Sequence, residues 1–137
     1  MRELANSAQT CRVRAGDAIL PGISAHDAPG HTPGHLIFML EGQDADLIFT
    51  GDAAKNRAEM LSRSGYMTYD ASVSRRSIDS IWALWKRKPG SILVPGHDVP
   101  MALRQGEPSY IGARTAAMSS WFGTDLDQTT LFELTAA

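Results

Sequence analysis

"HDAPGHTPGH", residues 26–35, holds three of the four histidines of this chain within ten positions. Two Pro-Gly pairs separate these histidines. Proline presets one backbone dihedral and glycine adopts conformations that other residues avoid, so the two pairs predict tight turns. The stretch therefore predicts a rigid turn that aims imidazoles toward a fixed point.

Apolar runs on both sides of this turn predict short buried strands. "LIFML" at 36–40 and "LIFT" at 47–50 are unbroken apolar runs, and the polar "EGQDAD" at 41–46 is typical of a hairpin loop between them. "ILPGI" at 19–23 and "SILV" at 91–94 predict further strands. Strands with helices after them indicate an α/β domain.

"VSRRSIDSIWALWKRKPG", residues 73–90, predicts the clearest helix. Ser74 is placed to cap its start, with Val73 and Ile78 as a hydrophobic staple. The Pro89-Gly90 pair ends it, and the basic residues before that pair suit the negative end of the helix dipole. The apolar positions with helical spacing are Ile78, Ile81, Trp82 and Trp85.

A second helix is expected from about Ser109 to Phe122, ending at Gly123, with one apolar face. That face comprises Ile111, Met118 and Phe122. Between the strands and the first helix, "AAKNRAEML" at 53–61 suits a short helix and "SRSGYMTYD" at 62–70 a loop. The loop residues Tyr66, Met67 and Tyr69 either line a pocket or serve as packing.

Length and composition restrict the class of protein. The 137 residues suit one domain, 1–137, and the 43% hydrophobic and 20% charged residues are ordinary globular values. A net charge of −2 gives no electrostatic reason to expect nucleic acid or an anionic membrane as a partner. The sequence shows no membrane-spanning run and no secretion signal at its start, and its single cysteine, Cys11, fits a cytoplasmic location.

Three places in the chain share one pattern, in which a glycine stands immediately before a residue of metal-ligand type. These are "APGH" ending at His31, "LIFTGD" ending at Asp52 and "ILVPGH" ending at His97. Residues at strand ends sit on a rigid scaffold, and glycine lets the backbone approach closely. Two imidazoles and a carboxylate form a plausible zinc ligand set. The joint pattern predicts a metal site at one edge of a sheet.

Each of these residues also has a simpler interpretation. Asp52 would cap a helix that begins at "AAKNRAEM", His97 would be a loop histidine and His31 a turn residue. His35 is interpreted as supporting the site or the turn, and His26 as neither. Because three separate segments share the pattern, a common metal site is favoured over an unrelated structural role for each residue.

"APGHTPGH", "LIFTGDA" and "VPGHD" together resemble the later motifs of the metallo-β-lactamase superfamily, nearest to glyoxalase II-like and lactonase-like hydrolases. The resemblance covers about residues 10–105. It implies the second half of an αββα sandwich, a mixed sheet with helices packed on one face, and a site for one or two zinc ions. It also implies that His31 binds one metal, that Asp52 bridges both and acts in catalysis, and that His97 binds the other.

The chain departs from this family in one respect. The signature His-x-His-x-Asp-His, which comes earlier in the family and supplies most of the remaining ligands, is absent from the sequence. The chain therefore resembles a partial domain that starts where the first half of the fold ends. Weak or absent hydrolysis of esters, lactones, thioesters or β-lactams is expected, and the sequence does not identify a small-molecule substrate.

The apolar strands also predict a partner. Continuous apolar runs indicate burial on both faces of a sheet, and the helices cover only one. The other face is expected to pair with a second copy, as a homodimer centred on strands 36–40 and 47–50, or with another chain. Three function classes remain: a metal-dependent hydrolase, an inactive half-domain that still folds, and a binding or regulatory subunit.

Overall fold

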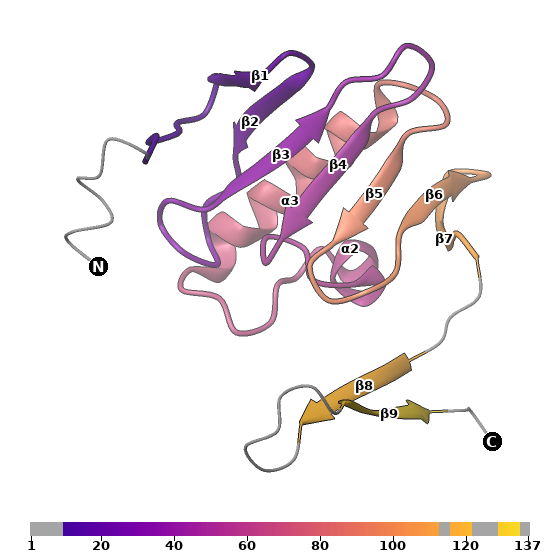
Figure 1. Cartoon of the computed structure of the whole chain (residues 1–137). Coiled ribbons are helices and arrows are strands. Elements are labelled where there is room, and N and C mark those ends of the chain that lie inside the picture. The colour runs from indigo at the N-terminus through magenta and orange to yellow at the C-terminus, as the bar shows by residue number, and fades with distance from the viewer. Residues whose placement is uncertain (1–9, 113–115, 122–128, 135–137) are drawn as a thin grey trace.

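The computed structural model describes residues 10–112, 116–121 and 129–134 (Figure 1). The described residues form a seven-stranded sheet, two helices and a separate two-stranded sheet, joined by turns and loops. The large sheet comprises β1 (Ala18–Leu20), β2 (Ile23–Asp27), β3 (Leu36–Leu40), β4 (Leu47–Gly51), β5 (Ile92–Pro95), β6 (Met101–Arg104) and β7 (Glu107–Tyr110). The helices are α2 (Arg57–Ser62) and α3 (Ala71–Lys86), and the small sheet pairs β8 (Ala116–Trp121) with β9 (Thr129–Leu134).

The strands of the large sheet lie in chain order, from β1 to β7. Every neighbouring pair is antiparallel except β4 and β5, which are parallel. Parallel neighbours need a long crossover connection, and here that connection contains α2 and α3. The predicted strand at 36–40 and the hairpin loop at 41–46 are confirmed.

One face of the sheet packs against the helices, as Figure 1 shows for α3. Alternate residues of each central strand point to this face because successive side chains in a strand point to opposite sides. The core is formed by buried side chains from the sheet (Ile37, Met39, Ile48, Leu93 and Met101) and from the helices (Met60, Ile78, Ile81, Trp82 and Trp85). The predicted fold class, a mixed sheet with helices on one face, is confirmed.

The opposite face of the sheet carries an apolar row. Phe38 lies directly across from Phe49, and Leu40 lies across from Leu47. Phe38, Leu40 and Phe49 are 37%, 37% and 41% exposed, whereas Ile37, Met39 and Ile48 on the helix side are almost fully buried. The apolar runs therefore alternate between a covered and an open side in the part of the chain that the structure describes.

The predicted N-cap of the long helix, Ser74, is wrong by four residues. Asp70 is the N-cap, and its carboxylate accepts hydrogen bonds from the backbone N–H groups of Ser72 and Val73. Ser74 lies one turn into α3 and is buried. Val73 and Ile78 therefore both lie inside α3, and the predicted hydrophobic staple at the helix start is wrong. A carboxylate satisfies two free N–H groups of the first turn, which is why Asp70 sets the boundary.

The second predicted helix, from Ser109 to Phe122, is also wrong. Ser109 and Tyr110 belong to β7, residues 111–112 form a bend, and residues 116–121 form β8, while 113–115 and Phe122 lie outside the described residues. The overlooked signal is the pair Gln105-Gly106, with φ of 54° and 84°, which joins β6 to β7. Positive φ at both central residues is typical of the type I′ turns that favour hairpins.

The predicted strand at 19–23 is likewise two strands. Pro21 and Gly22 form the turn between β1 and β2, and Gly22 has a φ of 80°. The Pro-Gly pair therefore acts as a turn in the middle of an apolar run, as Pro-Gly pairs commonly do.

Candidate functional site

Three loops at one end of the sheet carry the three candidate ligands. His31 lies in the turn between β2 and β3, Asp52 directly follows β4, and His97 lies just after β5. The carboxyl ends of parallel β4 and β5 lie at the same edge, and antiparallel β3 begins there. The topology therefore brings His31, Asp52 and His97 together. In the sequence, His31 and Asp52 lie 21 positions apart, and Asp52 and His97 lie 45 positions apart.

Glycines allow these loops to approach closely. A Cβ atom on Gly96 would lie 2.5 Å from the backbone oxygen of Gly51, so the residues before His97 and Asp52 are in backbone contact. Gly51 itself has a φ of 49°, a conformation that favours glycine. The backbone N–H of His97 also donates to the carbonyl of Lys55, at 2.8 Å. The sequence pattern of glycine before ligand thus corresponds to a close approach of the two loops that follow β4 and β5.

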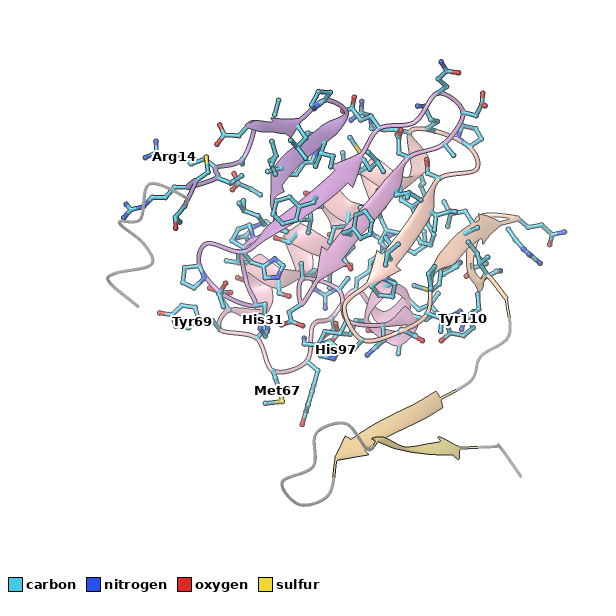
Figure 2. All side chains as sticks on the ribbon, viewed as in Figure 1. Arg14, His31, Met67, Tyr69, His97 and Tyr110 are labelled. Carbon is cyan, nitrogen blue, oxygen red and sulfur yellow. The ribbon has the colours of Figure 1, made fainter. Side chains whose placement is uncertain are left out.

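The carboxylate of Asp52 lies between the two imidazoles. Its Oδ2 is 3.3 Å from His31 Nε2, and its Oδ1 is 2.7 Å from His97 Nε2. Figure 2 shows His31 and His97 at the same end of the sheet. The hydrogen bond from His97, followed by the nearby His31, lowers the pKa of Asp52 below its ordinary value. The carboxylate is therefore charged at neutral pH and faces a nitrogen on each side.

The ring of His31 is oriented by a contact from a distant loop. Its Nδ1 lies 3.1 Å from the carbonyl oxygen of Met67. A carbonyl only accepts, so Nδ1 carries the proton and the lone pair of the neutral ring lies on Nε2, which faces Asp52. Metal-binding histidines commonly donate their other N–H to such an acceptor, which fixes the tautomer.

His35 contacts both Asp52 and His31. The backbone N–H of Asp52 donates to His35 Nε2 at 3.2 Å, and the His35 ring meets the His31 ring edge-on at 5.9 Å between centroids. Burial first, and then His31, lowers the pKa of His35, so this ring is neutral near neutral pH. Among the described residues, its buried Nδ1 has no hydrogen-bond partner. His26 lies on β2, where Ser24 contacts it, outside this cluster.

Lys55 and Glu59 join the site to the loop at 63–70. The Lys55 ammonium lies 3.3 Å from Glu59 Oε1 and donates to the Tyr66 carbonyl at 2.7 Å. Glu59 is buried and also accepts from the backbone N–H of Tyr66 at 2.8 Å. Sequence reasoning missed both side chains, although Asn56 with Glu59 three residues later is a helix-start signal.

The donor chemistry of this cluster fits zinc. The imidazole Nε2 atoms of His31 and His97 and the carboxylate of Asp52 are all ordinary zinc ligands. Each imidazole meets a different oxygen of Asp52, so the three groups do not surround one point. In agreement, the part of the chain that the structure describes contains no group of three or more His, Cys, Asp or Glu side chains arranged around a single ion.

The described residues thus form a mixed sheet with helices on one face, and His31, Asp52 and His97 meet at one end of that sheet. A family model for the metallo-beta-lactamase superfamily matches residues 3–97, and the chain belongs to this superfamily. No curated protein matches the chain. Within the described residues, the structure contains no helix long and apolar enough to cross a membrane.

Solved structures share the fold at low identity. A mutant of AiiA from B. thuringiensis, with N-decanoyl-L-homoserine at its active site, is 22% identical with a TM-score of 0.56, over 64% of this chain and 35% of that one. AbOPH, a hydrolase in the beta-lactamase superfamily, is 18% identical with a TM-score of 0.59, over 74% and 38%. AidC, a dizinc quorum-quenching lactonase in complex with a product, is 12% identical with a TM-score of 0.52, over 81% and 38%. The chain spans about a third of the length of these proteins.

Proposed function

We propose that this chain is a zinc-binding relative of the hydrolases of esters, lactones, thioesters or β-lactams, with weak or no hydrolytic activity of its own. His31 Nε2, Asp52 and His97 Nε2 would hold the metal. One observation carries this proposal: two imidazole Nε2 atoms and a charged carboxylate, all ordinary zinc ligands, meet at one end of the sheet, with the carboxylate oxygens 3.3 and 2.7 Å from the imidazoles. When bound, zinc supplies a water whose pKa is lowered to about 7.

The residues of the chain have distinct roles in this proposal. Met67 holds the His31 ring in the tautomer that leaves Nε2 free, and His35 holds the backbone of Asp52. The His97 side chain is 63% exposed, so this side of the cluster is open to a substrate. Low activity is expected because the His-x-His-x-Asp-His motif is absent from the sequence. In addition, the two imidazoles contact different oxygens of the one carboxylate and do not converge on a single point.

Zinc binding tests the site directly. Protein purified without chelator is analysed for metal content and then titrated with zinc by calorimetry. We expect zinc binding in the wild type and its loss in Asp52→Ala, because the substitution removes one of only three proposed ligands. His26→Ala is the matched control, since this histidine lies outside the cluster. Zinc binding that survives Asp52→Ala, or that His26→Ala removes equally, would contradict the proposal.

Turnover tests the second half of the proposal. Wild type and Asp52→Ala are compared with added zinc on an aryl ester, a thioester, an acyl-homoserine lactone and a β-lactam. We expect both proteins to show similar, low rates. Robust zinc-dependent turnover that Asp52→Ala abolishes would instead show a catalytically complete site.

A second candidate function is favoured by the open apolar row of Phe38, Leu40 and Phe49. In this alternative the chain is a non-catalytic half-domain that covers its sheet with a second copy or with another chain. Zinc content separates the two candidates, because only the first requires metal at the His31 and Asp52 cluster.

A further inference from the structure

The loop at 63–70 is held by its main chain. Tyr66, Met67 and Tyr69 are 76%, 76% and 81% exposed, which excludes the packing interpretation of these three residues. Figure 2 shows Met67 and Tyr69 at the same end of the molecule as His31 and His97. Because these side chains bury little surface, hydrogen bonds of the main chain fix the loop beside the cluster.

One end of the loop returns to the histidine turn. The Met67 carbonyl oxygen lies 3.1 Å from His31 Nδ1, and the backbone N–H of Tyr69 donates to the His31 carbonyl at 3.3 Å. Met67 has a φ of 51°, which is uncommon for a residue with a side chain. Such a conformation persists only where surrounding contacts hold it. The contact with His31 therefore depends on what fixes the residue before Met67.

That residue, Tyr66, is bound through both of its main-chain polar groups. Its N–H donates to Glu59 Oε1 at 2.8 Å, and its carbonyl accepts from the Lys55 ammonium at 2.7 Å. The ammonium also lies 3.3 Å from Glu59 Oε1, and the Lys55 backbone N–H donates to Glu59 Oε2 at 2.8 Å. The Glu59 carboxylate therefore uses both oxygens to connect α2 to Lys55 and to the loop.

A contribution to stability does not explain this buried carboxylate. Glu59 is only 5% exposed. Taking a carboxylate and an ammonium out of water costs free energy, and apolar side chains of similar volume often replace such a pair without loss of stability. An apolar side chain, however, accepts no hydrogen bond from the Tyr66 N–H. What the carboxylate supplies at this position is a fixed place for the loop.

We propose that Glu59 is a positioning residue for His31: it fixes Tyr66 so that the Met67 carbonyl holds His31 Nδ1, which leaves Nε2 for the metal. The inference rests on the proposed function, which it deepens by naming a residue that holds one zinc ligand in place. Groups that support a metal-binding histidine commonly change metal affinity by about 10–100-fold. Because Glu59 acts through two intervening residues, an effect near the lower end of this range is expected.

Replacing the whole ion pair separates positioning from stability. The double variant Lys55→Met, Glu59→Met keeps the buried volume, so its urea unfolding midpoint should stay close to that of the wild type. NMR contacts between the His31 ring and Met67 should be lost, and zinc affinity should fall roughly tenfold. Glu59→Gln keeps one oxygen that can accept from the Tyr66 N–H, so both effects should be smaller but present. This milder variant decides the question if the double variant does not fold.

The ion pair of Lys88 and Asp46 supplies a matched control. The Lys88 ammonium lies 3.0 Å from Asp46 Oδ1, and this buried carboxylate also accepts from a backbone N–H. Asp46 directly precedes β4, whereas Asp52 directly follows it. The double variant Asp46→Met, Lys88→Met should therefore keep both the His31 contacts and the zinc affinity.

Unchanged His31 contacts in the folded Glu59 variants, or equal losses in the control pair, would overturn the proposal. The NMR contacts are measured without metal. Failure of the wild type to bind zinc would therefore count against the proposed function and not against the role of Glu59 in holding His31.

Discussion

Gly30 determines where His31 lies. Its φ is 128°, and a Cβ atom there would lie 2.4 Å from the backbone N and Cα of Ser74 in α3. Only a residue without a side chain can therefore bring the histidine turn against the first turn of the helix. Gly34, four residues later in the same turn, has no heavy atom within 4 Å of such a Cβ.

This difference gives a matched pair of variants. Gly30→Ala should destabilise the chain and displace His31, because the added methyl overlaps backbone atoms of α3 that cannot move separately. Gly34→Ala should be tolerated, because its Cβ meets open space. Urea unfolding measures stability, and zinc titration measures the site. Equal unfolding midpoints for the two variants would contradict this account of the turn.

Asp70 controls the start of α3 through its charge. Its hydrogen bond from the backbone of Val73, followed by that from the Ser72 side chain, lowers the pKa of Asp70 below its ordinary value of 3.8. A lowered pKa means that the folded state favours the charged form. The stabilisation is therefore present above the unfolded pKa and is lost as pH falls through the lower, folded value.

We expect Asp70→Ala to lower the urea midpoint at pH 7, because two N–H groups of the first turn lose their acceptor. Asp70→Asn should retain much of the cap while removing the part of the acid dependence due to this residue, which sets in as pH falls toward and below the ordinary value of 3.8. Unfolding curves recorded across this fall in pH test both variants. An acid dependence identical in wild type and Asp70→Asn would rule out a contribution from this carboxylate.

At the scale of the element, α3 joins the site to the core. Trp85 is 1% exposed, and its ring N–H donates to the carbonyl of Ser91 at 2.9 Å, just before β5. Trp82 packs beside it, with ring centroids 5.5 Å apart, and donates to the carbonyl of Met60 in α2. The two indoles thus connect α3 to α2 and to the strand that leads to His97.

Trp85→Ala should destabilise the chain by about 3–5 kcal/mol, because it leaves a large cavity in the core. Trp85→Phe should cost less, since the ring volume is largely kept while the hydrogen bond to Ser91 is lost. Arg75→Ala, at an exposed position of the same helix, is the control and should be nearly neutral. Unfolding free energies measured in urea should follow this order, and a reversed order would contradict the packing described.

At the scale of the whole molecule, the open sheet face requires an explanation. Phe49 lies opposite Phe38 on one side and Val94 on the other, so the apolar row crosses β3, β4 and β5. Apolar burial stabilises the folded state by roughly 25 cal/mol per Å². A row of roughly several hundred Å² that stays exposed therefore leaves the folded chain several kcal/mol less stable than if the row were buried. Because a domain has a net stability of only about 5–15 kcal/mol, that is a large fraction.

We propose that a second copy covers this face through a two-fold contact centred on β3 and β4. The contact should be apolar and should bury roughly 2,000 Å² or more in total. Phe49→Lys should produce a monomer at low micromolar concentration, because it places a charge in the interface. Leu61→Lys, at a similarly exposed residue of α2, should remain dimeric. Sedimentation velocity distinguishes these outcomes, and a wild-type monomer would contradict the proposal.

The strand pattern and the meeting of His31, Asp52 and His97 could be predicted because their signals are local. The run at 36–40 is apolar along its whole length, and each candidate ligand follows its own glycine. The sequence does not locate the helix start because Ser74 and Asp70 are both good caps. Only packing against Gly30, which buries Ser74, decides between them. The helical spacing around residues 116–121 does not distinguish a helix from β8, because such spacing of a few apolar residues also occurs by chance in strands.

The sequence by itself therefore determined the family, the central strands and the three residues that gather at the end of the sheet. Only the tertiary structure decided how they are arranged. His31 takes its tautomer from the carbonyl of Met67, 36 residues away, and Asp52 contacts each imidazole through a different carboxylate oxygen. The physical reason is that patterns along the chain report interactions between near neighbours. The orientation of a side chain depends on backbone groups that distant segments bring into contact with it.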